Sequence, residues 1–68
     1  MSVATEIKIR REAMGLSQKE LGDRLDIGQS GVSAYETRRA IPSLDKAAKM
    51  AAMFGCSIDT LFYGENAG

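Results

Sequence analysis

Five residues between positions 29 and 37 carry short, uncharged side chains on one side of an expected helix. At 100° per residue they fan over about 140°, opposite an apolar edge formed by Val32 and Tyr35. The five are Gln29, Ser30, Ser33, Ala34 and Thr37. The hydroxyls and the amide can each donate and accept hydrogen bonds. A face that serves only solvation more often carries Lys or Glu, so this composition indicates a surface that contacts a polar partner.

A second amphipathic segment lies just upstream and begins with a capping box. Ser17 and Glu20 have the spacing at which each side chain satisfies a free backbone N–H at a helix start. The helix that follows, from position 18, buries Leu21 and Leu25. Gly22 lies beside them, and a glycine inside a helix costs about 1 kcal/mol relative to Ala. We therefore expect Gly22 to let another helix come close.

The segment 26–28 is expected to be the turn between these two helices. Asp26 tolerates a left-handed backbone better than most residues, and Gly28 can act as a modest helix cap. Ile27 is apolar within the turn and is expected to enter the core. The next helix runs from residue 29 to residue 36 or 37, so the pair of helices spans 18–37.

The N-terminal segment is expected to form a first helix with one apolar stripe. Ser2 or Thr5 can cap its start, and Gly15 can end it in a left-handed conformation. The stripe has spacings of four, four and three, and consists of Val3, Ile7, Arg11 and Met14.

Two more helices are expected in the C-terminal half. Ser43 caps one that ends at Gly55, and Ser57 caps a short one from position 58 to about position 63. The apolar side of the longer one consists of Leu44, Ala47, Ala48, Met50, Ala51 and Phe54. Residues 65–68 are expected to be a frayed end. No stretch alternates with period two over five residues, so the sequence predicts a single all-α domain of five helices spanning 1–68.

The composition argues against several classes of protein. The 68 residues include one cysteine, Cys56, and no histidine, which leaves neither an internal disulfide nor a set of soft metal ligands. A reduced, cytoplasmic setting fits this cysteine usage. No apolar run approaches the ~20 residues of a membrane span. There is also no glycine-rich phosphate loop and no plausible carboxylate pair, so we expect no catalytic residues, cofactor or small-molecule ligand.

The pattern resembles the lambda-repressor-like, or Cro-type, helix-turn-helix domains of phage and bacterial regulators, from about position 7 to position 64. The residues that carry the resemblance are Arg11, Gly15-Leu16-Ser17-Gln18, Glu20-Leu21, Ile27, Val32-Ser33, Tyr35-Glu36, Pro42-Ser43-Leu44, Ala51, Phe54-Gly55 and Ser57-Ile58-Asp59-Thr60-Leu61. Two positions differ from the family pattern: Asp26 stands where Gly is frequent, and Gly28 where a Ser or Thr cap is common. The weaker cap is expected to leave the third helix loose at its start until DNA binds.

The resemblance implies a compact five-helix domain with the helix-turn-helix at helices 2 and 3. It also implies sequence-specific binding of double-stranded DNA by a transcriptional regulator, in the simplest case a repressor that occupies a palindromic operator as a homodimer. In this family the third helix enters the major groove. The expected base contacts come from Gln29, Ser30, Ser33 and Ala34: the amide of Gln29 can pair with adenine, and the methyl of Ala34 can meet thymine.

The resemblance also assigns residues that hold the domain on DNA or hold its shape. Contacts to phosphate are expected from Ser17, Gln18, Lys19, Arg38 and Arg39. Gln18 is expected to brace Gln29 as well. Arg11 and Glu36 are expected to form an ion pair across helices 1 and 3, which fixes the recognition helix and does not contact DNA. The dimer surface is sought among Met53, Ile58, Phe62 and Tyr63, although Ile58 and Phe62 are expected to belong to the core.

The charge balance keeps a second interpretation open. Nine basic residues offset nine acidic ones, and a net charge of zero lowers the expected affinity for nonspecific DNA. This slightly favours a protein-interaction module on the same fold, of the antitoxin or anti-repressor type. The uncharged groove face followed by Arg38 and Arg39 favours DNA. An antitoxin would usually carry a toxin-binding extension as well. This sequence ends four residues after Gly64, which counts against an antitoxin unless the sequence is a fragment of a longer protein.

Overall fold

Within residues 2–64, serine residues begin four of the five helices. The side chains of Ser2, Ser17, Ser43 and Ser57 each accept a hydrogen bond from the backbone N–H three residues later. This contact satisfies one of the unpaired N–H groups at a helix start. The computed structural model describes residues 2–64, so the expected frayed end at 65–68 lies outside the described residues. The helices are α1 (Val3–Ala13), α2 (Gln18–Leu25), α3 (Gly28–Glu36), α4 (Leu44–Phe54) and α5 (Ile58–Tyr63).

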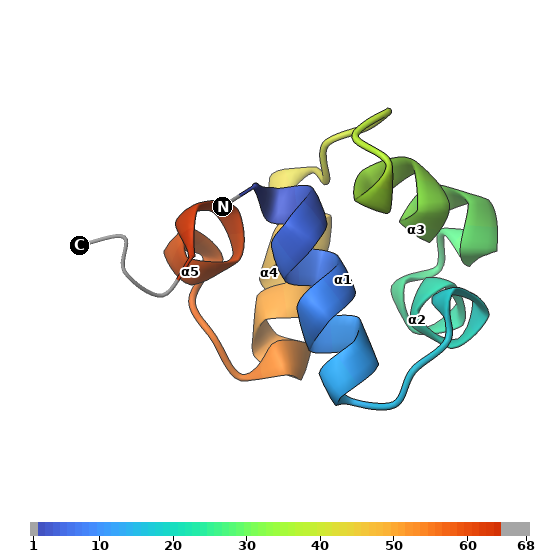
Figure 1. Cartoon of the computed structure of the whole chain (residues 1–68), viewed down its shortest axis with the longest axis horizontal. Helices are drawn as coiled ribbons and strands as arrows, with labels where there is room; N and C mark the ends of the chain where they lie inside the picture. The colour runs from blue at the N-terminus through green and yellow to red at the C-terminus, as the bar shows by residue number, and fades with distance from the viewer. Residues whose placement is uncertain (1, 65–68) are drawn as a thin grey trace.

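The five helices form the expected all-α arrangement, with α2 and α3 in contact at one end of the molecule and α5 at the opposite end (Figure 1). Helix α1 crosses the middle and contacts both α3 and α5. The ammonium of Lys46 on α4 donates to the backbone oxygen of Leu25 at 2.9 Å, which ties α4 to the last turn of α2. The helix-turn-helix is therefore supported from behind by α1 and α4.

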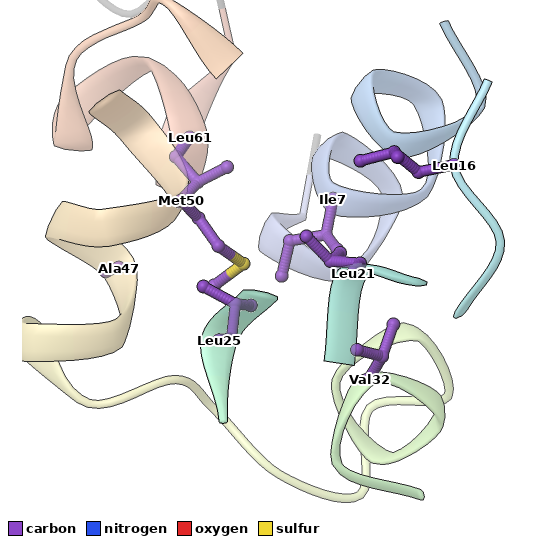
Figure 2. Packing of buried hydrophobic residues seen from close by; sticks show 8 residues of the cluster. All are labelled: Ile7, Leu16, Leu21, Leu25, Val32, Ala47, Met50 and Leu61. Atoms are coloured by element: carbon purple, nitrogen blue, oxygen red, sulfur yellow. The ribbon is translucent and has the colours of Figure 1, made fainter. Parts of the chain in front are cut away.

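The core collects apolar side chains from all five helices and from the loop before α2. Figure 2 shows Ile7 and Leu21 against each other and the side chain of Met50 extending toward Leu25. Fully burying a side chain of this size contributes about 1.5–3 kcal/mol. The buried cluster consists of Ile7, Leu16, Leu21, Leu25, Val32, Ala47, Met50 and Leu61.

Three apolar residues do not take the buried places that their spacing predicts. Met14 is 42% exposed because α1 ends at Ala13 and Met14 becomes its C-cap. Leu44 is 74% exposed at the first turn of α4, and Ala48 is also exposed. The buried side of α4 is narrower than predicted, since only its Ala47, Met50 and Ala51 are buried.

Candidate nucleic-acid interface

Helix α3 turns one face into the protein and leaves the other open. Val32 is completely buried, and Tyr35 packs against the core. On the other side Gln29 and Ser30 are exposed, while Ser33 and Ala34 are half-buried. The four candidate base-contacting residues thus lie outside the core on one helix. Their roles toward DNA stay predictions.

The turn between α2 and α3 depends on a very close backbone contact. Asp26 adopts the left-handed conformation with φ 63°, and the N–H of Ile27 donates to the carbonyl of Gly22 at 3.0 Å. A Cβ atom added to Gly22 would overlap the backbone carbonyl of Gly28. The expectation that Gly22 permits a close approach is therefore confirmed, and it is the backbone of α3 that approaches.

The start of α3 differs from the predicted cap. The helix begins at Gly28, one residue earlier than predicted, and Ile27 occupies the N-cap position with no side-chain cap hydrogen bond. Ile27 is half-buried and packs against the core, as expected. Gly28 has φ 72°, a conformation that glycine adopts without steric cost. The first turn of α3 is consequently held by the backbone contact to Gly22 and by the packing of Ile27.

The other end of α3 is fixed by a buried ion pair. Arg11 Nε donates to Glu36 Oε2 at 2.7 Å and Arg11 Nη2 donates to Glu36 Oε1 at 3.1 Å, while Nη1 reaches the carbonyl of Leu16 at 2.8 Å. The side chains of Arg11 and Glu36 are 11% and 4% exposed. The hydrogen bonds to Glu36 raise the pKa of Arg11 above its already high ordinary value, so the guanidinium stays charged. The pair joins α1, the loop before α2 and α3.

Gln18 belongs to the same network. Its amide Nε2 donates to Glu36 Oε1 at 3.1 Å, which places a side chain from the first turn of α2 on the last turn of α3. The sequence-based expectation directed Gln18 to Gln29 instead. A charged carboxylate is a stronger acceptor than a neutral amide, which accounts for the difference. A contact of Gln18 with phosphate stays a prediction.

The start of α2 carries the complete capping box that the sequence predicts. The N–H of Glu20 donates to Ser17 Oγ at 3.0 Å, and the N–H of Ser17 donates to Glu20 Oε1 at 2.9 Å. The second hydrogen bond lowers the pKa of the Glu20 carboxyl, since it favours the charged form. Next to it, Lys19 pairs with Asp23 at 3.1 Å, and both side chains are largely exposed.

The two arginines after α3 point to different parts of the domain. Arg38 has φ 64°, and its Nη2 donates to Ser2 Oγ at the start of α1, at 3.4 Å. Arg39 turns back along α3: its Nε donates to Thr37 Oγ1 at 2.9 Å and its Nη2 to Ser33 Oγ at 3.3 Å. The sequence analysis placed Thr37 on the outward face but gave it no role. The spacing of four between Ser33 and Thr37 places both hydroxyls on the same face of the helix, and this could have indicated that they share a partner.

Of the late apolar residues considered for pairing, one is prominently exposed. Met53, Ile58 and Phe62 are partly buried and pack against the core, whereas Tyr63 is 67% exposed. Two other apolar side chains are more open, Ile41 at 75% and Leu44 at 74%, on either side of the buried Pro42. Sequence reasoning missed this pair because it assigned Leu44 to the core.

Within residues 2–64, no group of three or more Cys, Asp or Glu side chains is placed to hold a metal ion. None of the helices described there has the length and apolarity needed to cross a membrane.

A family model described as helix-turn-helix (HTH_3) matches residues 7–61, well over half of the sequence. The chain belongs to this family. This family consists of Cro/C1-type, lambda-repressor-like transcription regulators, which are not enzymes. The helix-turn-helix of the family corresponds here to α2 and α3.

The chain is also similar to one curated relative and to three solved structures. It is 33% identical over 61 residues to the HTH-type transcriptional regulator ImmR of Bacillus subtilis, covering 90% of this chain but 48%, about half, of ImmR. The P22 c2 repressor, solved with a synthetic operator, shares the fold with a TM-score of 0.88 at 22% identity, over 96% of this chain and 98% of that chain.

Two further structures are somewhat more similar in sequence. The hypothetical transcription factor NHTF from Neisseria gives a TM-score of 0.78 at 32% identity, over 88% of this chain and 69% of that chain. SinR, the master regulator for biofilm formation, solved in complex with DNA, gives 0.76 at 28% identity, over 87% of this chain and 95% of that chain.

Proposed function

We propose that this chain binds double-stranded DNA in a sequence-specific manner and regulates transcription, with α3 in the major groove. The observation that carries the proposal is the outward face of α3, where hydrogen-bonding and methyl groups without charge lie on a helix fixed at both ends. A major groove admits one α-helix and presents a distinct pattern of donors and acceptors for each base pair. The likeness to SinR, whose structure contains DNA, supports the same use of the fold.

In this proposal Gln29 makes the main base contact. It lies in the first turn of α3 and is exposed, and its amide can give and accept a hydrogen bond with adenine at once. Ser30 is exposed in the same turn, and Ala34 lies one turn further along. Contacts to the DNA phosphates set the register of the domain on the duplex. In this proposal they come from Ser17, Gln18, Lys19, Arg38 and Arg39.

The test is selection of binding sites from random DNA, followed by affinity measurements on the selected site. Gln29→Ala is expected to lose about 1–3 kcal/mol of binding free energy on that site and less on random DNA, because an amide contact to a base edge is sequence-dependent. Equal losses on both DNAs would remove Gln29 as a base contact. The absence of any enriched sequence would reject the proposal and favour a protein-interaction module.

We further propose that the chain acts as a repressor by occupying a palindromic operator as a homodimer. Two copies double the number of base contacts and match half-sites about one helical turn apart. The exposed Ile41 and Leu44 are the apolar surface suited to pairing. Asp45 and Lys49, which lie 3.9 Å apart on the exposed side of α4, add one charge of each sign beside it. A second copy related by two-fold symmetry would meet each charge with its opposite.

This pairing surface can be tested with Ile41→Glu. The substitution is expected to leave the free energy of unfolding within about 0.5 kcal/mol of the wild-type value, because Ile41 is 75% exposed. It should reduce the cooperative binding of two copies to a palindromic site, measured by sedimentation with DNA. Unchanged binding of two copies would move the dimer surface elsewhere, for example to Tyr63.

A further inference from the structure

Arg39 is held along the last turn of α3 by two hydroxyl groups. Its Nε donates to Thr37 Oγ1 at 2.9 Å and its Nη2 donates to Ser33 Oγ at 3.3 Å. The hydroxyl of Thr37 in turn donates to the backbone carbonyl of Ser33 at 2.7 Å. The proton of Thr37 is thus committed to the helix backbone, and its lone pair is directed to Arg39. These contacts make a continuous chain from the helix backbone to the guanidinium.

The two hydrogen bonds use only one edge of the guanidinium. This group is planar and has five N–H donors in fixed directions. Nε–H and the neighbouring Nη2–H form one edge, and these are the donors that Thr37 and Ser33 occupy. The adjacent end of the group, formed by Nη1 and the second N–H of Nη2, matches the spacing of two phosphate oxygens. Arg39 is therefore anchored through one pair of donors while it presents another pair outward.

From this geometry we infer that Ser33 and Thr37 are positioning residues that hold Arg39 as a pre-ordered fork for a DNA phosphate. The inference rests on the proposed DNA binding and revises the sequence-based expectation for Ser33, which then acts through Arg39 and not on a base. A flexible arginine loses side-chain entropy when it binds, and a side chain that is already ordered loses less. Arg38 lacks this arrangement, because its guanidinium donates to Ser2 on α1.

The first test needs no DNA and examines the ordering of Arg39 itself. The heteronuclear NOE of the Arg39 Nε–H is expected to be high in the wild type. It should fall in Thr37→Val, which has nearly the same shape without the hydroxyl, and recover in Thr37→Ser, which restores the acceptor. A low value in the wild type, or a value that Thr37→Val does not change, would overturn the inference even if the protein binds DNA as proposed.

The second test measures whether this ordering matters for binding. Thr37→Val is expected to weaken binding by about two- to tenfold, to the same extent on the selected site and on random DNA. Arg39→Lys keeps the charge but not the fork. In an Arg39→Lys background Thr37→Val should therefore have no effect on affinity. The same loss in both backgrounds would mean that Thr37 acts independently of Arg39 and would overturn the inference.

Ser33→Ala separates the two roles available to that residue. As a positioning residue it should weaken binding to all DNA alike, and it should have no effect in the Arg39→Lys background. A loss confined to the selected site would return Ser33 to the base-contacting residues and overturn its positioning role. If no DNA sequence is bound at all, the proposed function fails. The DNA-free measurement on Arg39 still shows whether Ser33 and Thr37 order its side chain, so the two failures can be told apart.

Discussion

The two helices of the helix-turn-helix begin in opposite ways. Helix α2 is capped by its own residues, since Ser17 and Glu20 exchange hydrogen bonds across three positions. Helix α3 has no side-chain cap. Its first turn instead lies against the backbone of Gly22 on α2, and its last turn is joined to Arg11 on α1. The start of α2 is therefore capped by residues of its own first turn, whereas α3 is held by contacts with other helices.

This difference means that the outward residues at the start of α3 are not needed to hold the helix in position. A local cap would require particular side chains at the start of α3, where Gln29 and Ser30 face outward. The contacts that hold α3 in place come from Arg11, from Gly22 and from the inward side of α3. The outward residues at the start of α3 are therefore not needed to hold it. Three predictions test this division, from the largest expected effect to the smallest.

Removing the contact at the end of α3 should have the largest effect. Arg11→Ala leaves the buried Glu36 carboxylate with the amide of Gln18 but without a positive charge beside it, which is expected to cost about 3–5 kcal/mol of folding stability. The measurement is thermal unfolding in the absence of DNA, with Lys8→Ala on the exposed side of α1 as the matched control. If Arg11→Ala melted like Lys8→Ala, the position of α3 would not depend on the ion pair.

Removing the close contact at the start of α3 comes next. In Gly22→Ala the new methyl group would overlap the carbonyl of Gly28, and backbone atoms cannot move aside as a flexible side chain can. We expect a loss of about 3 kcal/mol in unfolding free energy, the upper end of the usual range for overpacking.

Asp23→Ala is the matched control for this change, since it is the neighbouring exposed position of the same helix and should stay within about 0.5 kcal/mol of wild type. A Gly22→Ala variant with normal stability would show that α3 can shift its start freely, which contradicts the close contact.

The cap of α2 should give the smallest effect, and one that depends on pH. The N–H of Ser17 holds the pKa of the exposed Glu20 carboxyl below its ordinary value of 4.5. A group with a lowered pKa stabilises the fold above its unfolded pKa, and this contribution is lost as the pH falls through the folded pKa. Glu20→Gln keeps a hydrogen-bond acceptor that does not titrate.

The melting temperatures of the wild type and Glu20→Gln should therefore converge as the pH falls from about 6 to about 3. Parallel curves over this range would mean that the charge of Glu20 plays no part in the cap.

Much of the fold follows from short-range patterns in the sequence. A serine directly before an amphipathic run marks a helix start, and a glycine directly after such a run marks a helix end. The five predicted helices are confirmed. The family resemblance also implies an Arg11–Glu36 pair, and the two side chains meet at 2.7 Å. The sequence pattern does not specify which of several possible partners a side chain will contact in the folded protein.

Gln18 illustrates this limit, because Gln29 and Glu36 are both acceptors on α3 and only the packed structure shows that it donates to Glu36. Leu44 shows the same limit for burial, since its helical phase suits the core while its place in the first turn leaves it exposed. The hydrogen bonds of Arg39 depend on the turn after α3, where Arg38 has a positive φ that the sequence does not signal.

The contact between Gly22 and Gly28 also bears on the shape of the DNA. Since there is no space for even a methyl group between α2 and α3 at this point, the two helices pack as closely here as their backbones allow. On the proposed mode of binding, this packing sets the distance between α3 in the major groove and the start of α2 at the DNA backbone. The pair of helices then fits best into a groove of one particular width. Duplexes whose groove already has that width would bind at lower deformation cost. Base pairs that no side chain touches could thus contribute to operator choice.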